Sequence, residues 1–415
     1  MIASLRSREA LVLLVPFVWL LVHRHQGHEG DLAFFFDWLA AFRHGADFYA
    51  LGPGLNYPIV GVFLVCGPAR LVEIVTGQAL DLEGFVAVFK TTLALGESLF
   101  LLSMALLAQE LEAKHPWRIA LLVYAMPSSW AMGAYFGQID IWGSALQLFA
   151  LHLVLHRRVA QSPWIYGVSC VASFFFILLT KQLAWLGLLP LTLAFVLRTH
   201  AHSERARIAQ GSLFALALSL VLMLTIDALV AWPFGIGSHL LLVLNAPGSA
   251  HLDLAVANGA SLWSLFVLGG TSASTSLFGP DWMTIGRVGK ALFVAFTGLT
   301  LFLQSRDSRN ARVQSLTAVG TIALLGAFIL PGSHERYLVH ALPPLLLIAF
   351  TQTRTLASWM TCVVSVLSGL YVLASIHWQA FDRPRFLRDP PLLVFAQALL
   401  LLALFVAMRR RLQPA

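Results

Sequence analysis

Residues 391–411 read PLLVFAQALLLLALFVAMRRR, an almost uninterrupted apolar run that ends in three arginines. A helix needs about 20 mostly apolar residues to cross the hydrocarbon core of a bilayer. Lys and Arg collect in the cytoplasmic connections of membrane proteins. The stretch therefore predicts a membrane-spanning helix over residues 391–408, whose carboxyl end lies in the cytoplasm.

Apolar runs of similar length recur along the whole 415-residue chain. The other candidate spans are residues 9–22, 58–76, 85–108, 117–136, 141–156, 164–180, 183–198, 210–231, 284–303, 314–330, 338–351 and 356–376. No alternation of apolar and polar residues at the spacing of a membrane β-barrel accompanies them. The sequence thus predicts an all-α, polytopic membrane protein with about 11–13 transmembrane helices.

The composition excludes several other classes of protein. Only 11% of the residues are charged and 58% are hydrophobic, whereas a soluble domain carries about 25% charged residues. This balance excludes a soluble globular protein, a disordered chain and a coiled coil. The three cysteines are far apart and form no disulfide or metal-ligand pattern. The net charge of the chain is +7. Membrane proteins commonly carry Lys and Arg in their cytoplasmic loops, so this charge does not indicate a nucleic-acid partner.

The basic connections occur at alternate ends of the predicted spans. They contain residues 157–158, 198–207, 306–312, 354 and 409–411, and we assign them to the cytoplasm. The extracytoplasmic side then receives residues 138–140, 181, 334–337 and two long outer loops, about 23–57 and 232–283. Because both loops are rich in apolar residues, we expect helices that lie along the membrane surface. A single polytopic domain over residues 1–415 is the simplest organisation.

The predicted sides conflict at one point. Tyr57 and Gln138 should both be extracytoplasmic, so an even number of spans must separate them, yet three apolar stretches lie between them. One of the three stretches therefore does not cross the membrane. The first, residues 58–76, is interrupted by Arg70 and Glu73. We expect this stretch to be interfacial or re-entrant.

The first outer loop contains a carboxylate between two aromatic residues, Phe36-Asp37-Trp38. A carboxylate that is partly shielded from water becomes a stronger base, which suits a general base in catalysis. We therefore expect Asp37 to lie among apolar side chains and to act on a substrate. The alternative is a carboxylate that caps a helix near the membrane surface.

The next outer corner reads Gly137-Gln138-Ile139-Asp140. We expect Asp140 to face Asp37 as a second acidic group that holds a metal ion or a sugar hydroxyl. The alternative is a carboxylate that stabilises the amino end of the next helix. Lys181 separates two apolar runs, where it either offers a cation to an anionic head group or only extends to the interface.

The segment Gly332-Ser333-His334-Glu335-Arg336-Tyr337 places polar side chains where a helix is expected to enter the membrane from outside. Arg336 can hold a phosphate with two hydrogen bonds, and His334 can donate to a phosphate oxygen or bind a metal. A zinc-protease motif is excluded, because Leu338 stands where the second histidine is required. Another polar run, from His23 to Asp31, is interpreted as a solvated interfacial segment.

Taken in order, these elements resemble a known group of membrane enzymes. The order is Asp37, Gly45-Ala46-Asp47-Phe48-Tyr49, Asn56-Tyr57-Pro58, Gly137-Gln138-Ile139-Asp140 and His334-Glu335-Arg336-Tyr337-Leu338. Over about residues 9–350, the chain is similar to the GT-C superfamily of integral-membrane glycosyltransferases. More narrowly, it resembles the polyprenyl-phosphate-mannose-dependent mannosyltransferases of bacteria and their relatives in glycolipid-anchor assembly. It departs from them at Ile59, where a second Pro is common, and in the isolated Asp37, where some branches have paired acids.

The resemblance implies a hexosyltransferase, more narrowly a mannosyltransferase, that moves a sugar with inversion from a polyprenyl-phosphate donor to an acceptor hydroxyl. Asp37 would be the catalytic base. The substrate would be bound by Tyr57, Gln138, Asp140, Lys181, His334, Glu335, Arg336 and Tyr337. A divalent cation, Mg²⁺ or Mn²⁺, is an optional cofactor, with Asp37 and Asp140 as its ligands. The partners would be membrane lipid, the donor and the acceptor, at the extracytoplasmic face of a bacterial plasma membrane.

Two other functions stay open on the sequence alone. The first is a multi-pass transporter or flippase for a lipid-linked or small anionic substrate. Such a protein should show inverted repeats and broken helices in matching halves, and the sequence shows neither feature. The second is a different membrane transferase or ligase that acts on a lipid-linked polymer. Product analysis with defined donors separates these functions from sugar transfer.

Overall fold

The computed structural model describes most of the chain. The described residues are 9, 11–43, 57–156, 161–230, 254–255, 260–267, 271–277, 279–306, 310–332, 334–352, 355–377 and 391–410. Within them the chain is helical and has no β-strand, only two isolated bridges, Leu254 with Ser272 and Ser276 with Thr284. The predicted all-α fold is confirmed.

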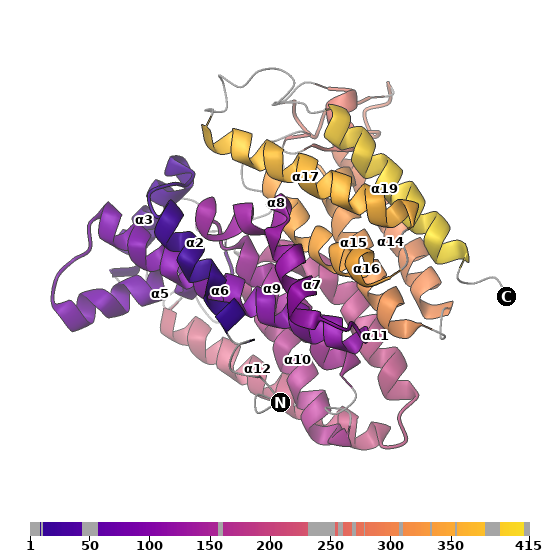
Figure 1. Ribbon diagram of the computed structural model, residues 1–415, viewed down its shortest axis with the longest axis horizontal. Helices are drawn as coiled ribbons and strands as arrows, with labels where there is room; N and C mark the ends of the chain where they lie inside the picture. Colours follow the sequence, from indigo (N-terminus) through magenta and orange to yellow (C-terminus); the bar gives the residue numbers. More distant parts are fainter. Residues whose placement is uncertain are drawn as a thin grey trace. The chain divides into compact units, whose positions relative to one another are not determined.

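The helices follow the order of Figure 1. They are η2 (Leu11–Leu14), α2 (Val15–His23), α3 (Glu29–Arg43), α5 (Ile59–Thr76), α6 (Leu82–Glu110), α7 (Pro116–Ala125), α8 (Pro127–Trp130), η3 (Ala131–Tyr135), α9 (Asp140–Leu155), α10 (Pro163–Thr180), η5 (Gln182–Gly187), α11 (Leu188–His200), α12 (Arg205–Val230), η7 (Leu262–Leu265), α14 (Ile285–Arg306), α15 (Ala311–Ile329), η8 (Glu335–His340), α16 (Leu342–Thr351), α17 (Leu356–His377) and α19 (Pro391–Arg410).

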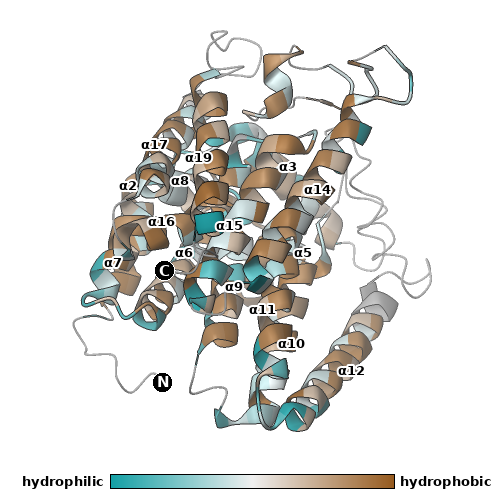
Figure 2. Cartoon of the chain, turned by 90° about the vertical axis from the view of Figure 1, so that its right-hand side faces the viewer, coloured by the Kyte–Doolittle hydropathy of each residue, from teal (hydrophilic) through white to brown (hydrophobic). Residues whose placement is uncertain are grey.

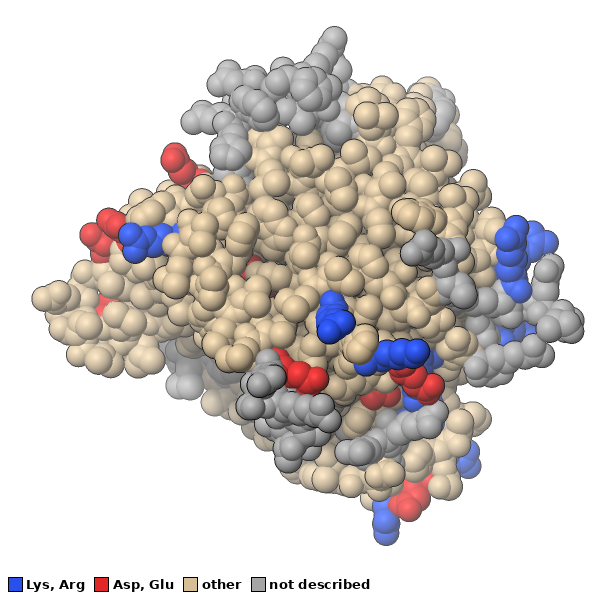
Figure 3. Space-filling model, viewed as in Figure 1, with Lys and Arg blue, Asp and Glu red and all other residues tan. Residues whose placement is uncertain are grey.

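In the described part of the chain, nine helices are long and apolar enough to cross a membrane, and three shorter apolar helices accompany them. Large apolar side chains are exposed along α12, α14, α17 and α19, where apolar residues predominate (Figure 2). On the face shown in Figure 3, charged side chains are few and scattered. Apolar surface of this extent requires a partner other than water. The chain is a multi-pass integral membrane protein.

The chain forms two compact units, each assembled from distant segments. The first unit contains residues 1–103, 132–185 and 199–247, and the second contains residues 104–131, 186–198 and 248–415. The boundary between residues 103 and 104 falls inside α6, so this helix contributes to both units. The prediction of a single polytopic domain stays a prediction.

Two of the predicted spans are not continuous helices. Residues 117–136 form three short pieces, because Pro127 begins α8 after an extended Met126 and Gly133 is non-helical within η3. Residues 338–351 begin in the 3-10 helix η8 and continue as α16, whose first turn contains proline. Proline lacks an amide hydrogen and cannot sit inside a regular helix without distortion. A continuous run of apolar residues therefore does not reveal these breaks.

α5 has the length and composition of a spanning helix, and contacts within the first unit hold the segments at both of its ends. Just before its start, Tyr57 donates a hydrogen bond to Gln138. After its end, the chain enters α6 about two turns before Lys90. Lys90 donates to the turn that follows α2, and His28 of the same connection binds the carbonyl of Phe136 at 2.9 Å. The interfacial or re-entrant course expected for residues 58–76 stays a prediction.

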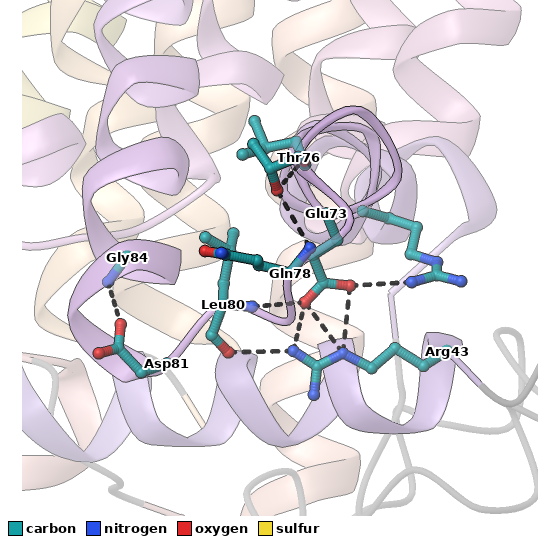
Figure 4. A network of polar contacts seen from close by, with 9 residues as sticks. Arg43, Glu73, Thr76, Gln78, Leu80, Asp81 and Gly84 are labelled. Atoms are coloured by element: carbon teal, nitrogen blue, oxygen red, sulfur yellow. Dashed lines mark hydrogen bonds and ion pairs between the residues drawn. The ribbon is translucent and has the colours of Figure 1, made fainter.

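A network of ion pairs fixes the end of α5 (Figure 4). The buried carboxylate of Glu73 accepts hydrogen bonds from Nε of Arg43 (3.0 Å), from Arg70 (3.1 Å) and from the amide of Leu80 (3.0 Å). Arg43 also donates to the carbonyl of Leu80 at 3.1 Å. These contacts tie the end of α3 to the corner between α5 and α6. They also account for the two ionisable residues that interrupt the apolar stretch 58–76.

Two buried ionisable residues of α6 bind backbone groups. Lys90 donates to the carbonyls of His23 (3.3 Å), the last residue of α2, and of Gln26, which follows the helix. Carbonyls at a helix end lack partners within the helix. Glu97 accepts a hydrogen bond from the amide of Ala134 at 2.7 Å, beside the break in η3. Both charges are therefore compensated inside the first unit. They hold in place the connections before α3 and before α9.

The second unit is built around α15. Nearly all residues of this helix are buried, and it packs against α14, α16 and α19. Part of the predicted outer loop 232–283 returns to its carboxyl end, where the indole of Trp263 in η7 donates to the carbonyl of Ile329 at 2.6 Å. The segment η8 also packs against α15.

Candidate functional site

Four segments of the first unit bring polar side chains to one place. Asp31 comes from the first turn of α3, Tyr57 precedes α5, Gln138 and Asp140 lie at the start of α9, and Lys181 separates α10 from η5. All five therefore lie near helix ends. Backbone groups at helix ends lack partners within the helix, so polar side chains gather there without interrupting an apolar span.

The local sequence accounts for these helix ends. Gly137 has a φ of +89°, a left-handed conformation that glycine adopts without strain, and it turns the chain toward α9. Asp140 is the first residue of α9, where the helix dipole stabilises a carboxylate. Lys181 is extended, with φ −153° and ψ 130°, and ends α10. Pro58 likewise is non-helical and directly precedes α5.

The deepest part of the cluster is an ion pair. Nζ of Lys181 lies 3.7 Å from Oδ1 of Asp140, and the two side chains are 6% and 0% exposed. The same ammonium lies 3.6 Å from the centroid of the Tyr57 ring, a distance suited to a cation–π contact. A buried charge is tolerated only with a well-placed partner. Here a carboxylate and an aromatic ring together compensate one cation.

A chain of hydrogen bonds leads from this pair toward solvent. The Tyr57 hydroxyl donates to Oε1 of Gln138 (3.4 Å), and Nε2 of Gln138 donates to Oδ2 of Asp31. Oδ2 of Asp31 also lies 3.4 Å from Nδ1 of His28, whose ring stacks on Phe136. Gln138 is buried, whereas the Asp31 side chain is 24% exposed. Asp31 is therefore the carboxylate through which the cluster meets solvent.

Asp37 is not part of this cluster. It is exposed, whereas Phe35, Trp38 and Leu39 of the same helix are buried. Six residues separate Asp31 from Asp37, so the helix period places them on different faces. The expected apolar surroundings of Asp37 are therefore wrong, because Trp38 faces the interior, Phe36 is half-buried and Asp37 itself is exposed. Its role as a base stays a prediction.

The residues around Asp140 do not fit a divalent cation. Mg²⁺ and similar ions are bound by carboxylate oxygens, but the Lys181 ammonium already lies beside Oδ1 of Asp140. The expected second ligand, Asp37, is exposed on another face of α3. The predicted metal pair of Asp37 and Asp140 is therefore not brought together. The positive charge of this cluster is supplied by Lys181.

Sequence reasoning missed Asp31, which it placed in a solvated run of histidines. The buried residues of α3 begin with Leu32 and Phe35. Asp31 precedes Leu32 directly and lies one turn before Phe35, so it borders the buried face of the helix. The helix period over residues 29–43 is the signal that could have found it.

The segment His334 to Tyr337 belongs to the second unit. It follows a turn at Gly332, whose φ is +74°, and it forms the start of a 3-10 helix instead of an α-helix. His334 is buried, and its ring centroid lies 5.4 Å from that of Tyr337. Arg336 and Tyr337 are half-buried, and the side chain of Glu335 lies outside the described part of the structure.

No protein-family model matches the sequence, and a search of curated proteins finds no match. The resemblance to GT-C glycosyltransferases therefore rests on the motifs. Of the motif residues, Tyr57, Gln138 and Asp140 lie together in the first unit. Asp47 and Asn56 lie outside the described residues.

Proposed function

We propose that the protein is a glycosyltransferase that moves a hexose, with mannose as the first candidate, from a polyprenyl-phosphate donor to an acceptor hydroxyl. The reaction would take place at the extracytoplasmic face of a bacterial plasma membrane and would invert the anomeric centre. The order of the motifs supports the enzyme class. The observation that carries the proposal is the cluster of Asp31, Tyr57, Gln138, Asp140 and Lys181 at the helix ends of the first unit.

The reaction needs a base and a stabilised leaving group. The base takes the proton of the acceptor hydroxyl, the hydroxyl oxygen bonds to the anomeric carbon, and the bond from that carbon to the donor phosphate breaks. The electrons of the broken bond leave with polyprenyl phosphate. The motif order assigns the base to Asp37, whereas the geometry favours Asp31. Asp31 is partly exposed, so it can meet an acceptor, and Gln138 orients its carboxylate.

The leaving phosphate needs positive charge nearby. Lys181 is the cation of the cluster, and a lipid phosphate that reached the end of α10 would compete with Asp140 for its ammonium. Because Lys181 and Gln138 are buried, water is largely excluded around them, which would limit hydrolysis of the donor.

A transfer assay with the full chain in proteoliposomes tests the proposal. Radiolabelled polyprenyl-phosphate mannose and polyprenyl-phosphate glucose are supplied as donors with a membrane glycolipid extract as acceptor, and the labelled product is identified. Asp31→Asn removes the base and should lower turnover at least ~100-fold. Donor binding should be retained. Asp37→Asn is the comparison on the other face of α3. Asp81→Asn, at an exposed turn before α6, is the control and should retain wild-type turnover.

The outcomes separate the assignments. A loss in Asp37→Asn with wild-type turnover in Asp31→Asn would return the base to Asp37. Wild-type turnover in both variants would contradict a base on α3. No labelled product from the wild-type protein with either donor would contradict the proposed function. Movement of the unchanged labelled lipid across the vesicle would then identify the alternative, a transporter or flippase.

A further inference from the structure

An open, mostly apolar groove lies in the second unit. Its volume is about 570 Å³, and ligand pockets commonly occupy roughly 300–1,000 Å³. The groove is formed by α15, α16, α17 and α19, the orange and yellow helices of Figure 1. Its lining includes Leu345, Ile348, Leu399, Leu402, Ala403 and Arg410.

The groove has the length of one membrane leaflet. Gln352, Thr355 and Arg410 lie at its mouth, where α16 and α19 end and α17 begins. Leu399 lies eleven residues before Arg410 on α19, which corresponds to about 16 Å along a helix. The hydrocarbon core of a bilayer is about 30 Å thick, so one leaflet contributes about 15 Å. A hydrocarbon chain that enters beside Arg410 therefore reaches the middle of the bilayer at the inner end of the groove.

The groove offers an apolar interior that is open to lipid. The hydroxyls of Thr317 and Thr361 donate to carbonyls of their own helices, each at 2.7 Å. They therefore need no polar partner in the groove. Leu399 and Leu402 are exposed on α19, a helix with the length and composition of a membrane span. Such a groove suits a hydrocarbon chain better than water, which would find few partners in its interior.

Within the described part of the chain, the mouth of the groove carries positive charge that no carboxylate pairs. At this end of the unit, Arg312 is paired with Glu110 (3.7 Å) and Glu112 (3.5 Å). Among the described residues, Arg409 and Arg410 have no carboxylate within ion-pair distance. Basic residues at helix ends mark the cytoplasmic side, and the cytoplasmic leaflet carries anionic lipids that such residues attract.

We propose that the groove binds one anionic glycerophospholipid of the cytoplasmic leaflet. Its phosphate lies beside Arg410, and one acyl chain runs along Leu345, Leu399 and Leu402. This site is separate from η8, because the groove lies at the amino end of α15 and η8 follows its carboxyl end. The 19 residues of α15 place about 28 Å between those ends. Binding of this lipid does not depend on the proposed transfer.

Lipid retention by the full chain tests this site. The protein is reconstituted in vesicles of equal parts phosphatidylglycerol and phosphatidylcholine, extracted in mild detergent and analysed by native mass spectrometry. We expect one retained phosphatidylglycerol and little phosphatidylcholine. Arg410→Gln should weaken retention of phosphatidylglycerol about tenfold, because it removes one charge-assisted contact to the phosphate. Arg409→Gln removes the same charge from the next residue, which does not line the groove, and should retain the lipid as the wild type does.

A second variant tests the acyl-chain site. Ala407 lines the groove and is half-buried near its mouth, so Ala407→Phe should block entry and abolish retention. An unchanged melting temperature in lipid-free detergent would show that this variant is folded. Equal retention of the two lipids would overturn the proposal, and so would equal losses in Arg409→Gln and Arg410→Gln, because general surface charge would explain them. Wild-type retention in Ala407→Phe would also overturn it.

Discussion

Charged side chains are buried in the polar cluster of the first unit but exposed at the groove of the second unit. In the cluster, Lys181 and Asp140 are buried and compensate each other. In the groove, the interior is apolar and Arg410 stays exposed at the mouth. Moving a charged group out of water costs several kcal/mol unless a nearby partner compensates its charge. A ligand of the buried Lys181 must therefore compete with Asp140, whereas Arg410 is exposed to a ligand from outside.

Lys181→Met should have the largest effect on stability. It leaves Asp140 as a buried carboxylate without its cation, and breaking a buried pair costs about 3–5 kcal/mol. We expect the free energy of unfolding to fall by this amount in denaturant titrations in detergent. The double variant Lys181→Met/Asp140→Leu removes both charges and should recover most of the loss. Failure of the double variant to recover would contradict the role given to this pair.

Glu73→Gln should have the next largest effect. The buried carboxylate holds both Arg43 and Arg70, and each hydrogen bond to a charged group contributes about 1.5–3 kcal/mol. We expect the free energy of unfolding to fall by about that amount in the same titration, because a neutral amide cannot compensate the charges of two guanidinium groups. Glu112→Gln, at an exposed carboxylate 3.5 Å from Arg312, is the matched control and should lose less than about 0.5 kcal/mol. Equal losses in the two variants would contradict the distinction between buried and exposed charge.

Tyr57→Phe should separate the two contacts of this side chain. It keeps the ring beside Lys181 and removes the hydroxyl that donates to Gln138, at a cost of about 0.5–1.5 kcal/mol. Tyr57→Leu removes the aromatic ring as well and should lower the free energy of unfolding by a further ~0.5–2 kcal/mol. Thermal unfolding of both variants measures the difference. If Tyr57→Leu is as stable as Tyr57→Phe, the ring does not stabilise the cation.

Arg207→Gln should have the smallest effect. Arg207 and Glu204 form an ion pair at 2.9 Å, but their side chains are 69% and 46% exposed. Water already solvates such groups, so the pair contributes less than about 0.5 kcal/mol. We expect no measurable change in melting temperature at physiological salt. A loss comparable to that of Glu73→Gln would show that exposure does not decide the contribution of a charge here.

Most helices could be predicted from the sequence, because a span requires only a run of apolar residues of sufficient length. The predicted spans 284–303 and 391–408 agree closely with α14 and α19. The breaks at Pro127 and within residues 338–351 could not be predicted in this way. Proline and glycine are tolerated in membrane helices when neighbouring groups satisfy the freed backbone. Glu97, which binds the amide of Ala134, is such a neighbour, and only the folded chain places it there.

The candidate site could be predicted in part. The sequence predicts that Tyr57, Gln138, Asp140 and Lys181 lie on one side, and the structure brings these four together. The same reasoning fails for the carboxylate of the first loop, because successive side chains are rotated by about 100° around a helix and so have different surroundings. The contact between Asp31 and Gln138 joins residues 107 positions apart. No local pattern encodes such a contact.

The turn at the end of α5 has a consequence for biosynthesis. The insertion machinery meets this stretch before any tertiary contact exists, and its length and composition are those of a span. Charged residues such as Arg70 and Glu73 oppose entry into the bilayer, by about 2.5–3.5 kcal/mol for an Arg at its centre. The same residues later join Arg43 in the folded protein. The same two residues therefore oppose insertion of this stretch before folding and fix the end of α5 after folding.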